Sequence, residues 1–239
     1  MTVHLVGAGP GDPALLTVAA LERLREARVV VYDRPSMDEI VALAPDDAER
    51  HCVGRARGRR ALSQPEVNAL LVQLGRAGDV VRLKSGDPFV ASRGGEEAVA
   101  LQAAGIAVNV IPGVSSALAA PAAAGIPLTH RGTVGAVHVA HGHARLSDAA
   151  VASVVDGSAS LVLLMGVALL PTHIARLLDA GADPDTPVAV VERATLPTQR
   201  ITRAPLGAVA GVAASRSVQA PAVVVLGAVA AEGLLAGIA

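Results

Sequence analysis

Short apolar runs alternate with helical stretches along the first half of the chain, and this alternation narrows the folds that it can adopt. Four runs are apolar throughout or nearly so, which is typical of parallel strands covered on both faces. They are residues 3–6, 29–32, 80–83 and 108–111. Between them, Asp12 is placed to cap a helix that begins at Pro13, and Ser63 forms a capping box with Glu66. The order strand, helix, strand, helix predicts an α/β fold with a parallel sheet.

The residue composition changes between Pro112 and Pro127, where small residues dominate between prolines and glycines. Such a stretch indicates a crossing between domains. Beyond it we expect four further strands and two helices. The strands are residues 137–140, 161–165, 188–191 and 222–226, and the helices are residues 168–180 and 208–214. The length of 239 residues fits this division. We therefore expect two α/β domains, residues 1–114 and 115–239.

The composition excludes several classes of protein. Hydrophobic residues make up 52% of the chain and charged residues 17%, which argues against intrinsic disorder. The formal net charge is −1, and Tyr32 and Phe89 are the sole Tyr, Phe or Trp residues. Nucleic acid is therefore not expected as a partner, because a basic surface and stacking side chains are both missing. The single cysteine, Cys52, cannot form an internal disulfide, which fits a reducing, cytoplasmic compartment.

Neither a membrane segment nor a metal site is expected. The most apolar window, residues 220–239, is long enough to span a bilayer, but it is better interpreted as a buried strand followed by a tail of small residues. The N-terminus lacks the basic region of a signal peptide. The histidines of H-V-A-H-G-H, residues 138–143, have no accompanying cluster of Cys or acidic residues that would complete a metal site.

A glycine-rich loop, G-A-G-P-G-D at residues 7–12, follows the first expected strand. Glycines allow a ligand to approach the backbone, and the start of a helix offers free N–H groups. The loop suggests a dinucleotide fingerprint, with Asp33 as the acid that binds the ribose. Asp12 argues against this interpretation, because it occupies the third glycine position and would place a carboxylate beside the pyrophosphate. An NAD site and a plain tight turn both remain open from this loop alone.

Further motifs point to one family. They are R-L-K-S-G-D-P-F-V-A-S-R-G-G-E-E at residues 82–97, P-G-V-S-S at 112–116, G-I-P-L-T-H-R at 125–131 and L-M-G-V at 164–167. Together with V-G-A-G-P-G-D-P at residues 6–13, they resemble the uroporphyrinogen III C-methyltransferase family, within the tetrapyrrole-type S-adenosylmethionine methyltransferases. The resemblance runs from Val3 to about Val229, with the motifs in the same order and spacing.

The resemblance implies a fold, a reaction and an assembly. It implies a kidney-shaped pair of α/β domains, with the active site and the cofactor in the cleft between them, and a cytoplasmic homodimer. The implied reaction transfers methyl groups from S-adenosylmethionine to carbons 2 and 7 of uroporphyrinogen III. Its products are precorrin-2, for sirohaem and cobalamin biosynthesis, and S-adenosylhomocysteine.

The resemblance also assigns two catalytic residues. Asp33, in V-Y-D, is the implied proton acceptor, although an ordinary acidic residue at a strand end is the alternative. Arg55 stands where the family usually has Lys, and an arginine does not readily give up a proton. Arg55 could still hold a substrate carboxylate. The four arginines of R-A-R-G-R-R, residues 55–60, either steer a carboxylate-rich substrate or form a solvated loop.

Binding residues follow from the same motifs. The implied cofactor contacts are Pro10, Ser85, Gly86, Asp87, Val90, Ser115, Ser116, Met165 and Ala194. The implied substrate contacts are Arg93, Thr129 and His130. Asp87 could equally cap the next turn, and Met165 could equally belong to the core. Glu96 and Glu97 are expected only to favour the first turn of a helix.

The chain departs from the family pattern at several of these positions. It has S-G-D-P for G-G-D-P, F-V-A-S-R for F-V-F-G-R, Ser115-Ser116 for Thr-Ala and Arg193-Ala194 for Asn-Gly. These departures leave the particular tetrapyrrole and the number of methylations open. A methyltransferase for a later precorrin is therefore the second candidate. An NAD-binding oxidoreductase and a non-catalytic cofactor-binding protein are the remaining ones.

Overall fold

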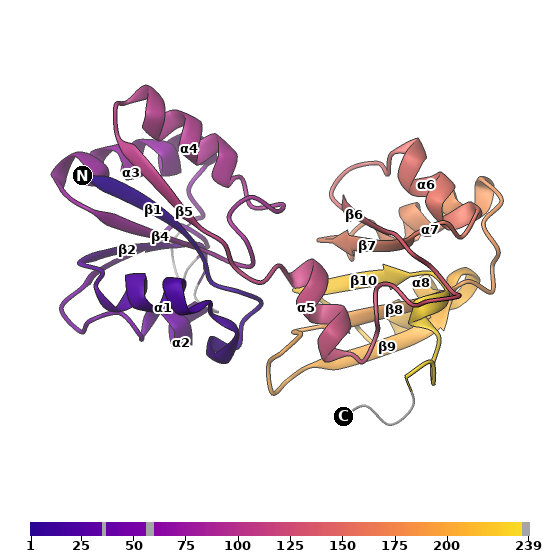
Figure 1. The fold of residues 1–239 in the computed structure, drawn as a ribbon. Helices are drawn as coiled ribbons and strands as arrows, with labels where there is room; N and C mark the ends of the chain where they lie inside the picture. Colours follow the sequence, from indigo (N-terminus) through magenta and orange to yellow (C-terminus); the bar gives the residue numbers. More distant parts are fainter. Residues whose placement is uncertain (35–36, 56–59, 236–239) are drawn as a thin grey trace. The chain divides into compact units, whose positions relative to one another are not determined.

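The computed structural model describes residues 1–34, 37–55 and 60–235 of the chain. It divides into two compact units, Met1–Ser115 and Ser116–Ala239. Within the described residues, each unit contains one five-stranded sheet with helices packed against it (Figure 1).

The first sheet is parallel throughout, which confirms the prediction for this half of the chain. Its strands are β1 (Thr2–Gly7), β2 (Val29–Tyr32), β3 (Glu49–Cys52), β4 (Val80–Lys84) and β5 (Ala107–Ile111), in the order β3-β2-β4-β1-β5. The sequence did not predict β3, because Glu-Arg-His-Cys lacks an apolar run. This polarity is permitted because β3 is an edge strand, with the Glu49 and Arg50 side chains exposed.

Helices cover both faces of the first sheet. α1 (Val18–Arg25) and α2 (Asp38–Val41) lie on one face, and α3 (Gln64–Ala77) and α4 (Gly94–Ala103) lie on the other (Figure 1). Successive strand residues point to opposite faces. Val30 accordingly packs in the core with α1 and α2, and Val31 packs in the core with α3 and α4. This double burial explains why the inner strands are largely apolar.

The first helix begins later than the sequence predicted. Asp12 does act as a cap, but of a single 3₁₀ turn, η1 (Pro13–Leu15), in which its Oδ1 accepts a hydrogen bond from the Ala14 N–H at 2.8 Å. The chain then extends, and Thr17 caps α1 by accepting from the Ala20 N–H at 3.2 Å. The prediction of a helix that begins at Pro13 was therefore wrong. The chain leaves the helical conformation after the 3₁₀ turn, and Thr17 caps a separate helix. The capping box of Ser63 and Glu66 is confirmed at the start of α3.

The second sheet is mixed. Its strands are β6 (Val137–His141), β7 (Ser160–Leu164), β8 (Pro187–Glu192), β9 (Arg200–Pro205) and β10 (Ala222–Leu226), in the order β6-β7-β10-β8-β9. The β6–β7 pair is parallel and the other three pairs are antiparallel. The four expected strands are confirmed. The fifth, β9, was missed because its sequence, R-I-T-R-A-P, is largely polar and lies at a sheet edge.

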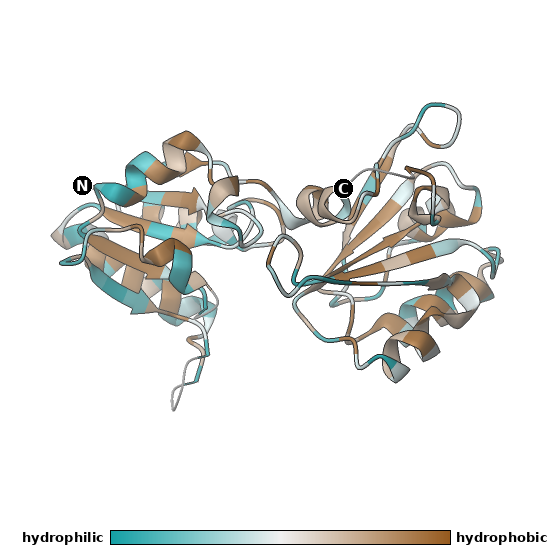
Figure 2. Ribbon diagram, turned by 90° about the horizontal axis from the view of Figure 1, so that it is seen from below, coloured by the Kyte–Doolittle hydropathy of each residue, from teal (hydrophilic) through white to brown (hydrophobic). Residues whose placement is uncertain are grey.

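Four helices pack on the second sheet. They are α5 (Ser116–Ala123), α6 (Asp148–Val155), α7 (Leu170–Asp179) and α8 (Leu206–Ser215). The last three form a hydrophobic core with the sheet, whereas α5 contacts β7 and β10. Figure 2 shows mainly hydrophobic strands in both sheets, with hydrophilic residues on several of the helices around them.

The boundary between the two units falls after Ser115, within the stretch between Pro112 and Pro127. Most of that stretch is not a connection, because residues 116–123 form α5. Ala117, Ala119 and Ala120 are buried there, so the small side chains allow a helix to pack closely on the sheet. No described helix is long and apolar enough to cross a membrane. Residues 222–226 instead form the buried strand that the sequence predicted.

Candidate active site

The loops that follow the first sheet's strands carry most of the expected site residues. Parallel strands end at one edge of their sheet, and ligands of such sheets bind at that edge. Pro10 follows β1, Asp33 follows β2, Ser85 to Asp87 follow β4, and Gly113 to Ser115 follow β5. The structure therefore brings the N-terminal group of expected residues to a common edge.

Three of these loops touch one another through glycine backbones. Gly9 and Gly86 exchange two hydrogen bonds, from the Gly9 N–H to the Gly86 oxygen at 3.1 Å and from the Gly86 N–H to the Gly9 oxygen at 2.7 Å. A Cβ on Gly113 would lie 2.4 Å from the Gly86 oxygen, and one on Gly7 would lie 2.4 Å from the Gly113 nitrogen. Side chains at these positions would force the loops apart, so the edge depends on glycine.

Asp87 holds two of the loops together. Its Oδ1 accepts a hydrogen bond from the Phe89 N–H at 2.8 Å, and its Oδ2 accepts one from the Gly113 N–H at 3.1 Å. The first bond confirms the expectation that Asp87 could cap its own turn. The second was not expected, and it fixes the position of the β5 loop relative to the β4 loop. A contact of Asp87 with a cofactor stays a prediction.

Asp33 is held at the end of β2 by two donors. Its Oδ1 lies 2.5 Å from Nη2 of Arg82, and its Oδ2 accepts a hydrogen bond from the Ser85 N–H at 3.3 Å. Burial alone would raise the pKa of this carboxyl, but the positive charges of Arg82 and Lys84 and the two hydrogen bonds outweigh it. The pKa of Asp33 therefore lies below its ordinary value. Asp33 is therefore ionised at neutral pH. Its side chain keeps 24% of its surface exposed, so the carboxylate is accessible.

A group of charges that was not expected from the sequence lies behind Asp33. Arg82, Lys84 and Glu97 are almost completely buried, at 2%, 1% and 0% exposed. Glu97 Oε1 lies 2.9 Å from Arg82 Nη2 and 2.8 Å from Lys84 Nζ. The expectation that Glu97 only favours the first turn of α4 was therefore wrong. A signal was present, because Arg82 lies in a strand expected to be covered on both faces and Lys84 follows that strand directly.

The loop after β4 ends in unusual backbone conformations. Ala91 and Arg93 have positive φ angles, of 58° and 64°, and Arg93 is the N-cap residue of α4. The Arg93 side chain is exposed and pairs with Glu96, its Nη2 lying 3.1 Å from Oε2. Phe89 and Val90 expose 57% and 39% of their surface. This loop therefore presents a cation and an apolar surface to solvent.

Arg55 lies in a loop that contacts Asp33. A Cβ on Gly54 would lie 1.7 Å from the backbone oxygen of Asp33, so this glycine allows the two chain segments to touch. Arg55 itself is exposed. Of the other arginines in this basic run, Arg57 and Arg59 lie outside the described residues. Arg60 pairs with Glu66, with Nη2 2.5 Å from Oε1.

The second unit places two expected cofactor residues at one edge of its own sheet. Met165 follows β7 and Ala194 follows β8, and both strands run antiparallel to β10 between them. Met165 is 37% exposed, so it is not a core residue. Its φ is 58°, and Arg193 and Thr195, on either side of Ala194, have φ of 47° and 68°. Such strained backbone is concentrated at functional sites in proteins.

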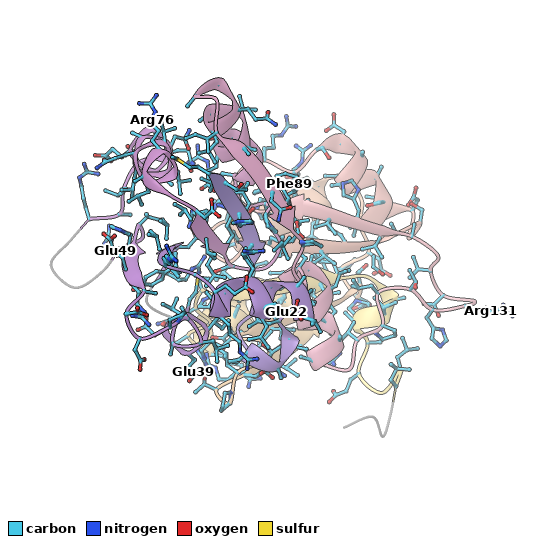
Figure 3. All side chains as sticks on the ribbon, turned by 60° about the vertical axis from the view of Figure 1, so that its left-hand side comes forward. Glu22, Glu39, Glu49, Arg76, Phe89 and Arg131 are labelled. Atoms are coloured by element: carbon cyan, nitrogen blue, oxygen red, sulfur yellow. The ribbon has the colours of Figure 1, made fainter. Side chains whose placement is uncertain are left out.

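Of the expected residues, Ser116, Thr129 and His130 lie outside these loops. Thr129 is exposed and His130 is half-buried, and His130 forms an isolated β-bridge with Val134. Figure 3 shows Arg131, the next residue, at the tip of a projecting loop. Ser115 is buried and Ser116 is the first residue of α5.

The geometry argues against a dinucleotide fingerprint. In that fold the acid follows the strand next to the glycine-rich strand. Here β4 separates β1 from β2, so Asp33 does not follow a neighbour of β1. Asp12 in addition caps the 3₁₀ turn directly after the glycines, where the dinucleotide motif would begin its helix.

The α/β sheet with glycine-rich loops at its carboxyl edge is typical of an enzyme that binds a small molecule there. Comparison with known proteins identifies the family. Residues 2–210 match the family of Tetrapyrrole (Corrin/Porphyrin) Methylases, and the chain therefore belongs to this family. The chain is 44% identical to the S-adenosyl-L-methionine-dependent uroporphyrinogen III methyltransferase of Methanosarcina barkeri, over 94% of this chain and 90% of that protein. It is 42% identical to the siroheme synthase of Hahella chejuensis, but spans only 49% of that longer protein.

Solved structures show the same fold. Uroporphyrin-III C-methyl transferase from Thermus thermophilus, complexed with S-adenyl homocysteine, matches with a TM-score of 0.82 and 41% identity, over 96% of this chain and 98% of that one. A cobalt precorrin-4 methyltransferase matches with a TM-score of 0.84 and 26% identity, over 96% of each chain. The two α/β units thus have the tetrapyrrole methylase fold.

Proposed function

We propose that this chain is an S-adenosylmethionine-dependent methyltransferase that methylates uroporphyrinogen III at carbons 2 and 7 and gives precorrin-2. The observation that carries the proposal is the 44% identity with the Methanosarcina barkeri enzyme over 90% of that enzyme's length. The likeness to a Thermus thermophilus enzyme in complex with S-adenyl homocysteine supports the choice of methyl donor. The product would serve sirohaem or cobalamin biosynthesis.

The residues at the edge of the first sheet fit the proposed methyl donor. Gly86 and Gly113 carry no side chain, which lets a ligand approach the backbone of these two loops closely. Val90 and Phe89 add exposed apolar surface that suits a purine. In this proposal the donor is held by Pro10, Ser85, Gly86, Asp87, Val90, Ser115, Ser116, Met165 and Ala194. The location of the donor between two domains stays a prediction of the resemblance.

Asp33 is the proposed proton acceptor. When bound, S-adenosylmethionine supplies a methyl group whose carbon–sulfur bond breaks, with its electron pair left on sulfur, as the new carbon–carbon bond forms. The substrate then carries an added positive charge and must lose a proton. The lowered pKa keeps the Asp33 carboxyl ionised and ready to accept this proton. A carboxylate is a weak base, but it is sufficient here because a cationic ring gives up a proton readily.

Exposed arginines are the proposed holders of the substrate's carboxylates. Arg93 and Arg55 both present guanidinium groups to solvent, and such groups bind carboxylates through paired hydrogen bonds. Because Gly54 contacts Asp33, Arg55 would bind a carboxylate close to the proposed acceptor. Thr129 and His130 are proposed as further substrate contacts.

The test is methyl transfer from labelled S-adenosylmethionine to enzymatically prepared uroporphyrinogen III. Two labels in each tetrapyrrole are the expected result. Label in later precorrins but not in uroporphyrinogen III would overturn the proposal in favour of the second candidate. That candidate is supported by the departures in the loop motifs and by the likeness to cobalt precorrin-4 methyltransferase. Thermal stabilisation by NAD but not by S-adenosylhomocysteine would exclude both methyltransferases.

Two further properties belong to the proposal. The resemblance implies a homodimer, which analytical ultracentrifugation of the purified chain would detect as a species of twice the chain mass. It also implies a cytoplasmic enzyme, and the single Cys52 supports a reducing compartment.

A further inference from the structure

Glu97, a buried residue of α4, makes several contacts with charged side chains that no role described so far explains. Glu97 Oε1 accepts hydrogen bonds from Arg82 Nε at 3.2 Å, Arg82 Nη2 at 2.9 Å and Lys84 Nζ at 2.8 Å. Gln64 adds a fourth contact from α3, at 3.4 Å. The Glu97 side chain is completely shielded from solvent. It is therefore out of reach of any substrate, and can affect chemistry only through the groups that it contacts.

One of those groups contacts Asp33 directly. Arg82 Nη2 lies between Asp33 Oδ1 and Glu97 Oε1, at 2.5 Å and 2.9 Å. The other nitrogens of the guanidinium are engaged elsewhere, because Nε donates to Glu97 and Nη1 donates to the Leu83 carbonyl at 3.2 Å. Arg82 can consequently offer Asp33 a single nitrogen. The second oxygen of Asp33 is left to the Ser85 N–H.

The four charged groups are balanced. Arg82 and Lys84 contribute two positive charges from β4, Glu97 contributes a negative charge from α4, and Asp33 contributes another from the end of β2. These are the charged side chains that the structure places against Asp33, directly or through Arg82. Three of the four are buried and only Asp33 is partly exposed. Asp33 is thus the member of this set that a solvent molecule or a ligand can contact.

Stability alone does not account for such a set. Moving charges out of water costs several kcal/mol per ion, and well-packed apolar residues often stabilise a core as well or better. The set occurs beside the one residue proposed to accept a proton. A role in holding that residue accounts for both its burial and its position.

We propose that Glu97 is a positioning residue for Asp33, which it holds in a single ionised orientation by fixing Arg82 and by balancing the charge of Lys84. This inference rests on the proposed role of Asp33 in methyl transfer. Without the Glu97 charge, two buried cations face a single carboxylate. Arg82 can then donate hydrogen bonds to Asp33 from two nitrogens. Asp33 becomes a weaker proton acceptor, because these donors stabilise its ionised form.

The test compares three variants with the wild-type chain. Glu97→Gln removes the charge and keeps the shape. Lys84→Met combined with Glu97→Gln removes one charge of each sign and restores the balance between Arg82 and Asp33. Leu101→Val is the matched control, because Leu101 is buried on the same helix one turn further on and is an uncharged residue of the hydrophobic core. Methyl transfer, S-adenosylhomocysteine affinity, Tm and the pH dependence of kcat are measured for each.

Glu97→Gln is expected to lower kcat about three- to tenfold and to move the acid limb of its pH profile to lower pH, because the remaining cations lower the pKa of Asp33 further. S-adenosylhomocysteine affinity is expected to stay within threefold. The double variant is expected to recover most of kcat and to return the acid limb. Leu101→Val is expected to lower Tm and leave the pH profile unchanged.

The inference and the proposed function fail in different ways. A wild-type chain that transfers no methyl group contradicts the proposed function. A wild-type chain that is active, with a Glu97→Gln variant whose pH profile matches that of Leu101→Val, overturns the inference. The carboxyl ¹³C signal of Asp33, assigned by its loss in Asp33→Asn, gives a readout that does not need activity. A pKa of Asp33 that stays the same in Glu97→Gln would likewise overturn it.

Discussion

The carboxylate of Asp87 accepts a hydrogen bond from the backbone N–H of Gly113, at 3.1 Å. The two residues belong to loops that follow different strands, β4 and β5, and lie 26 positions apart in the chain. The other oxygen of Asp87 accepts from the Phe89 N–H in its own loop. One side chain therefore sets the spacing of two loops that are proposed to hold the methyl donor.

Asp87→Asn is expected to weaken S-adenosylhomocysteine binding about tenfold, because an amide offers a single acceptor oxygen and one of the two hydrogen bonds to a charged group is lost. Isothermal titration calorimetry measures this change. Asp183→Asn is the matched control, since Asp183 accepts from the Asp185 N–H at 2.9 Å in an exposed turn of the second unit. Equal affinities for Asp87→Asn and the wild-type chain would show that the loops keep their spacing without this carboxylate.

Asp33→Asn is expected to lower kcat for methyl transfer by roughly 10²- to 10⁴-fold, the usual contribution of a general base. S-adenosylhomocysteine affinity is expected to change little. The pKa of Asp33 lies below its ordinary value, so wild-type activity should persist as the pH falls to about 4 and decline only below that. A variant that keeps more than a tenth of wild-type kcat would remove Asp33 from the proton transfer.

Gly113→Ala is expected to lower Tm and abolish measurable S-adenosylhomocysteine binding. The added Cβ would lie 2.4 Å from the Gly86 oxygen and 2.7 Å from Gly7 backbone atoms, and none of these can move without displacing a loop. Gly211→Ala is the control, because an added Cβ there has no atom within 4 Å. Gly211 lies inside α8, where alanine should stabilise the chain by about 0.5–1 kcal/mol. Normal donor binding by Gly113→Ala would contradict the close packing of the loops.

Glu192→Gln is expected to lower Tm by roughly 2–8 °C at pH 7, because Glu192 is buried and accepts hydrogen bonds from Arg200 at 2.7 and 3.1 Å. Burial would raise the pKa of Glu192, but the hydrogen bonds from Arg200 and the Gln219 N–H, and the Arg200 charge, lower it below its ordinary value. Its stabilisation is therefore complete above about pH 5 and is lost as the pH falls through the lowered pKa. The difference in Tm between variant and wild type should shrink below about pH 4. A difference that is constant with pH would contradict this ion pair.

The apolar pattern predicted the parts of the fold that are buried on both faces. Strands such as β4 and β10 were found because their neighbours exclude water from both sides. β3 and β9 were missed because an edge strand tolerates Arg, Glu and Thr, which carry no apolar period. The start of α1 was misplaced because Asp12 and Thr17 are both good N-caps, and only the folded chain selects between them.

The site was predictable where a motif fixes the backbone, and less so where partners are distant in sequence. Gly86 was expected to contact the cofactor, which stays a prediction, and the structure places its backbone against Gly9 and Gly113. Glu97 was misjudged because its position in a first helical turn has a sufficient local explanation. Its partners, Arg82 and Lys84, are 13 to 15 positions away, and nothing in the sequence alone shows that α4 places Glu97 over β4.

The central place of β10 affects how the chain can fold during synthesis. Every strand of the first sheet has left the ribosome once residue 111 has emerged, so that sheet can form early. In the second sheet the pair β6–β7 is joined to the pair β8–β9 only through β10, which lies between β7 and β8 and is made some 30 residues after β8 ends. Until residues 222–226 emerge, two apolar strands keep open edges, which are the usual starting points for association with other chains. The second unit therefore has a stronger need than the first for protection by chaperones on the nascent chain.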